Sequence, residues 1–95
     1  MMTVEKHFVV SYDLHNQGNC QPVWEYLEKL GGARLLESVW VVSGYFSATQ
    51  VRDDLKTVMD PKDSAAVVEL KPGSVWATQK VRDDGAAWLH RNILR

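Results

Sequence analysis

The sequence predicts a single α+β domain in which strands and helices alternate in the order βαββαβ, followed by a strand and a helix. Short segments in which apolar residues alternate with polar ones are typical of strands, and apolar residues repeated every three or four positions are typical of helices. Both patterns occur in turn along the chain. A length of 95 residues suits one domain. We place that domain at residues 1–95, with a core at about 7–70 and a C-terminal extension at 71–95.

The first predicted strand, residues 7–14, ends near a carboxylate and organises the rest of the chain. Successive strand side chains point to opposite faces of a sheet. One face of this strand therefore carries Phe8, Val10, Tyr12 and Leu14, and the other carries His7, Val9, Ser11 and Asp13. The first face is strongly apolar and the second only partly so. We therefore expect helices to cover the first face, and solvent or a second subunit to meet the second.

Two amphipathic helices are predicted between the strands. The first begins near Pro22 and ends at Gly31, because proline is tolerated in a first helical turn and glycine suits a helix C-terminus. The second begins at Ser47, which can form a capping box with Gln50, and ends at Asp60 before a proline. Each has one apolar stripe and one charged side.

The remaining segments favour strands and a final helix. Residues 34–45 form either one long strand or, as we favour, two strands divided near Glu37. Residues 64–70 form another strand, residues 74–78 a short edge strand, and a helix begins at Asp83. This βαββαβ order is that of a ferredoxin-like fold with both core helices on one face of the sheet. The opposite face is then open to a partner.

Composition narrows the class of protein. Apolar residues at 45% and charged residues at 24% are ordinary globular values. The single Cys20 excludes an intrachain disulfide and a cysteine-rich zinc site, which fits a reducing compartment. No apolar run approaches the roughly 18 residues of a membrane span, and the first residues lack the signal-peptide pattern. We expect a cytoplasmic protein with no membrane partner, and the sequence offers no evident small-molecule site.

Charge is unevenly distributed along the chain. From residue 71 onward five basic residues stand against two acidic ones, whereas the preceding residues include six basic and ten acidic ones. Such asymmetry indicates either a tail that faces phosphates or a solvated surface. Lys80, Arg82 and Arg91 are the basic residues of this tail that we select as candidate contacts for nucleic acid or another partner.

Several short motifs follow one another in a characteristic order. They are Tyr12-Asp13-Leu14, Gly32-Ala33-Arg34-Leu35, Glu37-Ser38-Val39-Trp40, Ser47-Ala48 and Asp63-Ser64. This succession resembles the Cas-two family of CRISPR-associated proteins, and more closely a set of small stand-alone bacterial relatives of unassigned activity. Those relatives also have tryptophans in positions similar to Trp40, Trp76 and Trp88. The resemblance covers about residues 7–70 well and the tail less well.

The resemblance implies a ferredoxin-like homodimer built on the open sheet faces, with a strand after Pro72-Gly73 that can add to the partner's sheet. In family members credited with nuclease activity, the aspartate that matches Asp13 binds magnesium near the dimer axis together with its copy. A carboxylate oxygen suits Mg²⁺, which keeps most of its waters and can activate one of them against a phosphodiester. Other members act as scaffolds for duplex DNA, a role in which that aspartate need not act.

The sequence departs from the family pattern beside Asp13. The following loop, residues 15–21, has no Arg or Lys to meet phosphates, and Glu37 stands where basic or neutral residues are commoner. We therefore favour a non-catalytic homodimer that binds nucleic acid or protein through Lys80, Arg82 and Arg91. The alternative is a magnesium-dependent endonuclease or endoribonuclease that uses Asp13 of both subunits as catalytic residue and metal ligand.

Overall fold

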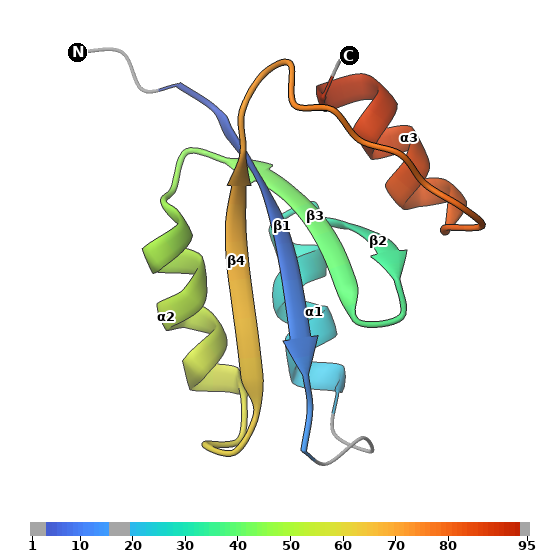
Figure 1. Cartoon of the computed structure of the whole chain (residues 1–95). Helices are drawn as coiled ribbons and strands as arrows, with labels where there is room; N and C mark the ends of the chain where they lie inside the picture. The colour runs from blue at the N-terminus through green and yellow to red at the C-terminus, as the bar shows by residue number, and fades with distance from the viewer. Residues whose placement is uncertain (1–3, 16–19, 94–95) are drawn as a thin grey trace.

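The computed structural model describes residues 4–15 and 20–93 and confirms the predicted α+β class. Its elements are β1 (Lys6–Asp13), α1 (Gln21–Lys29), β2 (Ala33–Leu36), β3 (Val39–Gly44), α2 (Ala48–Val58), β4 (Ser64–Leu70) and α3 (Asp83–Asn92). The strands form one antiparallel sheet in the order β2-β3-β1-β4, with β1 paired on both sides (Figure 1). Residues 34–45 are thus divided into two strands, as we favoured.

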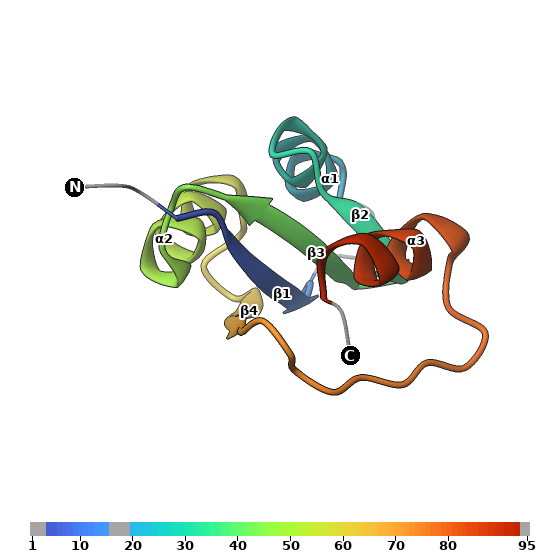
Figure 2. The same cartoon turned by 90° about the horizontal axis from the view of Figure 1, so that it is seen from above.

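α1 and α2 cover one face of the sheet, as predicted, and α3 lies on the other (Figure 2). The core under α1 and α2 is formed by side chains that alternate along β1 and β3 and by one stripe of each helix. These buried residues are Phe8, Val10, Tyr12, Val23, Leu27, Trp40, Val42, Val51 and Leu55. The predicted face of β1 therefore packs against the two helices.

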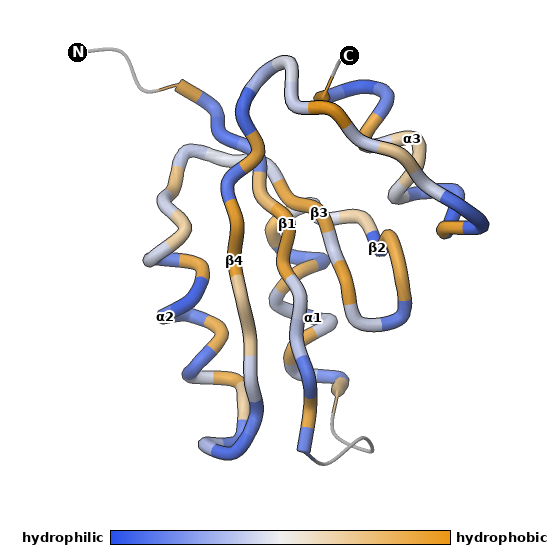
Figure 3. The backbone as a smooth tube through the Cα atoms, viewed as in Figure 1, coloured by the Kyte–Doolittle hydropathy of each residue, from blue (hydrophilic) through white to orange (hydrophobic). Residues whose placement is uncertain are grey.

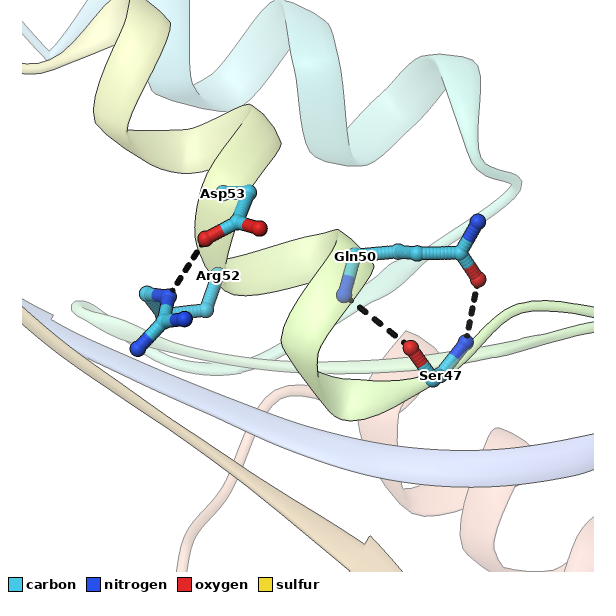
Figure 4. A network of polar contacts seen from close by, with 4 residues as sticks. All are labelled: Ser47, Gln50, Arg52 and Asp53. Carbon is cyan, nitrogen blue, oxygen red and sulfur yellow. Dashed lines mark hydrogen bonds and ion pairs between the residues drawn. The ribbon is translucent and has the colours of Figure 1, made fainter.

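Local signals set the ends of these helices. The Ser47 hydroxyl accepts a hydrogen bond from the Gln50 backbone N–H (3.1 Å), and the Gln50 side-chain oxygen accepts one from the Ser47 N–H (2.8 Å; Figure 4). The capping box predicted for α2 is thus confirmed. Gly31 follows α1 with φ of +76°, a left-handed conformation that glycine adopts without strain.

One hydrogen bond joins the outer sides of α1 and α2. The Tyr26 hydroxyl donates to Asp54 Oδ2 at 3.0 Å. Burial, followed by the hydrogen bond and the negative charge of Asp54, raises the pKa of Tyr26 well above its ordinary value. The phenol therefore remains a donor at neutral pH.

α3 covers the part of the second sheet face formed by β2 and β3. Trp88 and Leu89 of α3, with Ile93 directly after it, pack on Val41 of β3, with partly buried neighbours from β1 and β2 around them. The face expected to be open is therefore half covered by the chain's own C-terminal helix. The side of this face formed by β1 and β4 stays accessible, and Val68 is 57% exposed there.

The predicted strand at residues 74–78 is wrong. The segment between β4 and α3 contains no strand and runs as a long arc from one side of the sheet to the other (Figure 2). Val75 is 89% exposed, and the Trp76 indole N–H donates to the Ile93 carbonyl at 2.7 Å. The Arg82 N–H donates to the Leu35 carbonyl (3.0 Å), so α3 starts beside β2. Residues 74–78 therefore belong to the connection that crosses from β4 to β2, although their apolar residues alternate as in a strand.

None of the helices in the described ranges is both long enough and apolar enough to span a bilayer.

Gly85 lets α3 approach β2 closely, and an added methyl group tests this contact. A Cβ at Gly85 would lie 2.6 Å from the Arg34 carbonyl oxygen and 2.6 Å from Leu35 Cα. Both atoms belong to backbone, so the clash cannot be relieved by rotating a side chain. We expect Gly85→Ala to lower the free energy of unfolding by about 1–2 kcal/mol, despite a helix-propensity gain of about 1 kcal/mol.

Urea unfolding followed by tryptophan fluorescence measures this loss. Ala87→Gln is the matched control, since Ala87 is exposed on the same helix and its enlargement should change stability by no more than about 0.5 kcal/mol. Equal stability of Gly85→Ala and the control would contradict the close packing of α3 on β2.

Candidate functional site

Asp13 lies at the end of β1, exposed, on the wall of a hollow of about 350 Å³. The hollow is lined by Tyr12, Asp13, Leu14, Cys20, Trp24, Glu37 and Ser38. Glu37 belongs to the turn between β2 and β3, so the fold places two carboxylates from separate elements on one hollow. The sequence pattern indicates Glu37 as a strand division and as a departure from the family pattern beside Asp13, but does not predict that both residues line one hollow.

The Tyr12 hydroxyl holds the wall of this hollow together. It accepts hydrogen bonds from the Trp24 indole N–H (2.8 Å) and the Trp40 indole N–H (3.3 Å), and it donates to the Glu37 carbonyl (3.3 Å). The Tyr12 backbone N–H also donates to the Ser38 carbonyl at 3.1 Å. One side chain of β1 thus fixes α1, β3 and the turn that carries Glu37.

Two carboxylates can contribute to a magnesium site, because Mg²⁺ is commonly bound by one or two carboxylates together with water and substrate phosphates. Within residues 4–15 and 20–93, no group of three or more His, Cys, Asp or Glu side chains is placed to hold a metal ion. A magnesium ion at Asp13 would therefore take further ligands from water, substrate or a second copy of the chain.

The other polar residues near Asp13 have structural roles. The His15 backbone N–H donates to Asp63 Oδ1 at 2.6 Å, and Asp63 Oδ2 accepts from the Asp60 N–H at 2.9 Å. Asp63 thereby ties the chain that leaves β1 to the chain that enters β4. Cys20 stands at the N-cap of α1, partly buried. Most of the loop that lacks basic residues, 16–19, lies outside the described residues.

Two of the three predicted basic contacts lie beside Arg34 of β2. Arg82 and Arg34 line one hollow of about 510 Å³, and Arg91 and Arg34 line another of about 320 Å³. Lys80 is exposed in the segment before α3, with φ of +54°, and lines neither hollow. The fold therefore places three arginines around two hollows at the β2 edge, and the sequence pattern does not indicate Arg34 as one of them.

The Arg34 side chain is held by aromatic rings. Its guanidinium carbon lies 4.0 Å from the Trp24 ring centroid and 5.7 Å from that of Trp40. Its Nε and Nη2 atoms are buried and have no hydrogen-bond partner among the described residues. Stacking on indole offsets part of the cost of burying these donors. Arg34 lies opposite Trp40 across the β2–β3 pair, a register that local sequence patterns do not reveal.

Carboxylates accompany these arginines. Asp83 and Asp84 line the first hollow, and Glu28 and Asp84 line the second. In the described part of the chain, the ion pairs within 4 Å are Arg52–Asp53 and Lys71–Glu69, neither of which involves these residues. The β2 edge thus presents interspersed charges of both signs rather than a continuous basic patch.

No model of a known protein family matches this chain, and no solved structure matches it either.

Removing the Tyr12 hydroxyl tests its role in the hollow. Tyr12→Phe leaves two indole N–H groups and one carbonyl without this partner, so we expect a loss of about 1–3 kcal/mol in the free energy of unfolding. Tyr45→Phe is the control, because Tyr45 is 66% exposed. Urea unfolding of both variants measures the difference, and a Tyr12→Phe protein as stable as the control would show that the hydroxyl is dispensable.

Proposed function

We propose that this chain is a cytoplasmic, homodimeric module of the Cas-two-like kind with a ferredoxin-like fold, and that it binds nucleic acid without catalysing a reaction. The succession β1-α1-β2-β3-α2-β4, with β1 between β3 and β4, supports the fold assignment. The observation that carries the binding role is the gathering of Arg34, Arg82 and Arg91 at one sheet edge.

Guanidinium groups suit this role because their planar donors match phosphate oxygens in pairs. Arg34 is already oriented by Trp24 and Trp40, so it loses little side-chain freedom on binding. Arg82 and Arg91 each line a hollow together with Arg34. The nearby carboxylates limit the attraction to a few direct phosphate contacts, and a protein partner with mixed charge is the competing ligand class.

Salt dependence tests the nucleic-acid role. We expect the double variant Arg82→Ala/Arg91→Ala to weaken binding of a short oligonucleotide. It should also reduce the slope of log affinity against log salt concentration by about one unit for each phosphate that the variant no longer neutralises. Fluorescence anisotropy with single-stranded and duplex RNA and DNA measures both quantities. Lys80→Ala gives the contribution of the third predicted residue.

Lys29→Ala is the matched control, because Lys29 is an exposed cation at the end of α1. Equal affinities for the control, the double variant and the unmodified chain would contradict the proposed nucleic-acid contacts. Binding of a protein by the unmodified chain, with no binding of any oligonucleotide, would favour the competing ligand class.

The second candidate function is magnesium-dependent cleavage of a phosphodiester by Asp13 of both subunits. The observation that favours it is the shared hollow of Asp13 and Glu37, which offers two hard oxygen ligands. In this alternative the carboxylates would hold the ion and orient its waters, one of which attacks phosphorus.

Asp13→Ala separates the two candidates. If the chain is a nuclease, this change should abolish magnesium-dependent cleavage of RNA or DNA without changing the mass of the dimer in light scattering. Asp53→Asn on the exposed side of α2 should leave cleavage intact. Cleavage that survives Asp13→Ala would come from a contaminating enzyme, and the non-catalytic proposal would then stand.

A further inference from the structure

β4 presents an open edge to the surroundings. It pairs with β1 over its whole length, and no strand of the described chain pairs with its other side (Figure 1). Alternate residues of an edge strand direct backbone N–H and C=O groups outward. Edge strands are commonly protected by lysine, proline or a bulge, but β4 has none of these within its sequence Ser-Ala-Ala-Val-Val-Glu-Leu. Its middle is apolar (Figure 3), and hydrophilic Glu69 separates this middle from Leu70 at the end of the strand.

A charged hollow lies along the same strand. It measures about 520 Å³ and lies between α2 and the first residues of β4. Its lining includes the cations Arg52 and Lys56 from α2, the carboxylates Asp60 and Asp63, and Ala65 of β4. Within the described residues, Arg52 forms its ion pair with the adjacent, exposed Asp53 (Figure 4). The hollow thus offers two cations and two carboxylates to a chain that adds to this edge.

We infer that β4 pairs antiparallel with β4 of a second copy, with Val67 opposite the partner's Val67. The inference rests on the homodimer of the proposed function and places its contact at the β4 edge, instead of the open sheet face that the family resemblance implies. This register places Glu69 opposite the partner's Ala65, beside the hollow that contains the partner's Arg52 and Lys56. It also places Lys71 opposite the partner's Asp63. Each contact occurs twice because of the two-fold symmetry.

The faces of the strand agree with this pairing. Ala65, Val67 and Glu69 lie opposite Tyr12, Val10 and Phe8 of β1, whose side chains point toward α1 and α2. Glu69 therefore lies on the same face as the hollow. Moving the axis to Ala66 would place Glu69 opposite the partner's Asp63, which is repulsive. Charge complementarity thus favours the register centred on Val67 over the one centred on Ala66.

Glu69 and Lys71 are available for these contacts. They form a 2.9 Å ion pair at the C-terminal end of β4, in which the Lys71 side chain is exposed and the Glu69 side chain is partly buried. The hydrogen bond from Lys71 lowers the pKa of Glu69, so the carboxylate is charged at neutral pH. In the paired molecule, the Glu69–Lys71 ion pair lies beside the partner's Arg52 and the partner's Asp63, so positive and negative charges alternate across the two-fold axis. The paired molecule has one continuous sheet with a β2 edge, and its arginines, at each end.

Cysteine cross-linking tests the register directly. In a Cys20→Ser background, Val67→Cys should form a disulfide-linked dimer on mild oxidation, because directly opposite residues of an antiparallel pair have Cα atoms about 4.5–5.5 Å apart. Val68→Cys is the control, since residue 68 lies opposite the partner's Ala66 and too far from its own copy. Cross-linking of Val68→Cys with none of Val67→Cys would overturn the edge pairing and indicate contact through the open sheet face.

A charge exchange tests the contact of Glu69 with the hollow. Glu69→Lys, or Arg52→Glu with Lys56→Glu, should weaken self-association in sedimentation equilibrium by about tenfold or more, because like charges then face each other. Combining the changes should restore it, and Lys29→Glu on α1 should have no effect. The inference would be overturned if the combined variant self-associated no more strongly than Glu69→Lys. It would also be overturned if the unmodified chain were monomeric at every concentration.

Measuring oligonucleotide binding by the same variants shows which of the two proposals fails. A chain that cross-links through Val67→Cys but binds no oligonucleotide retains the edge pairing and contradicts only the nucleic-acid role. A chain that binds oligonucleotide but cross-links through Val68→Cys retains the proposed function and contradicts only the edge pairing.

Discussion

The structure depends on β1, the central strand, which is paired on both sides and whose two faces are covered to different extents. Phe8 and Val10 are fully buried under α1 and α2, so these helices complete one side. On the other side, the His7 ring is hydrogen-bonded to Ser43 Oγ (2.7 Å) and lies edge-on to Trp88, with ring centroids 5.6 Å apart. A strand between two neighbours exposes only its faces. On the second face α3 covers β2 and β3 and reaches β1 at His7, while the side formed by β1 and β4 stays accessible.

The same strand connects the core to the candidate site. Tyr12 has its ring in the main cluster and its hydroxyl among Trp24, Trp40 and the Glu37 carbonyl. The next residue, Asp13, stands at the rim of the hollow, so its backbone position is set by buried neighbours rather than by the loop that follows. A carboxylate fixed in this way can be presented to a second molecule with little loss of chain entropy.

The two edges of the sheet differ in physical character. At β2, the Arg82 N–H reaches the Leu35 carbonyl and α3 packs closely through Gly85, so this edge is shielded by the chain itself. At β4 no described strand covers the edge of the sheet. In our proposals the shielded edge presents arginine side chains to nucleic acid and the open edge presents backbone to a second copy. The two roles do not compete for surface.

The sequence by itself determined the capping box of Ser47 and Gln50 and the end of α1 at Gly31, and it favoured the division of 34–45 into two strands. These features depend on residues a few positions apart, so local patterns encode them. Only the tertiary structure decided that α3 covers β2 and β3, that residues 74–78 form a crossing instead of a strand, and that Arg34 lies beside Arg82 and Arg91. Those outcomes join residues about fifty positions apart. They depend on strand register and on which sheet face remains to be covered. The spacing of apolar residues within one segment reveals neither.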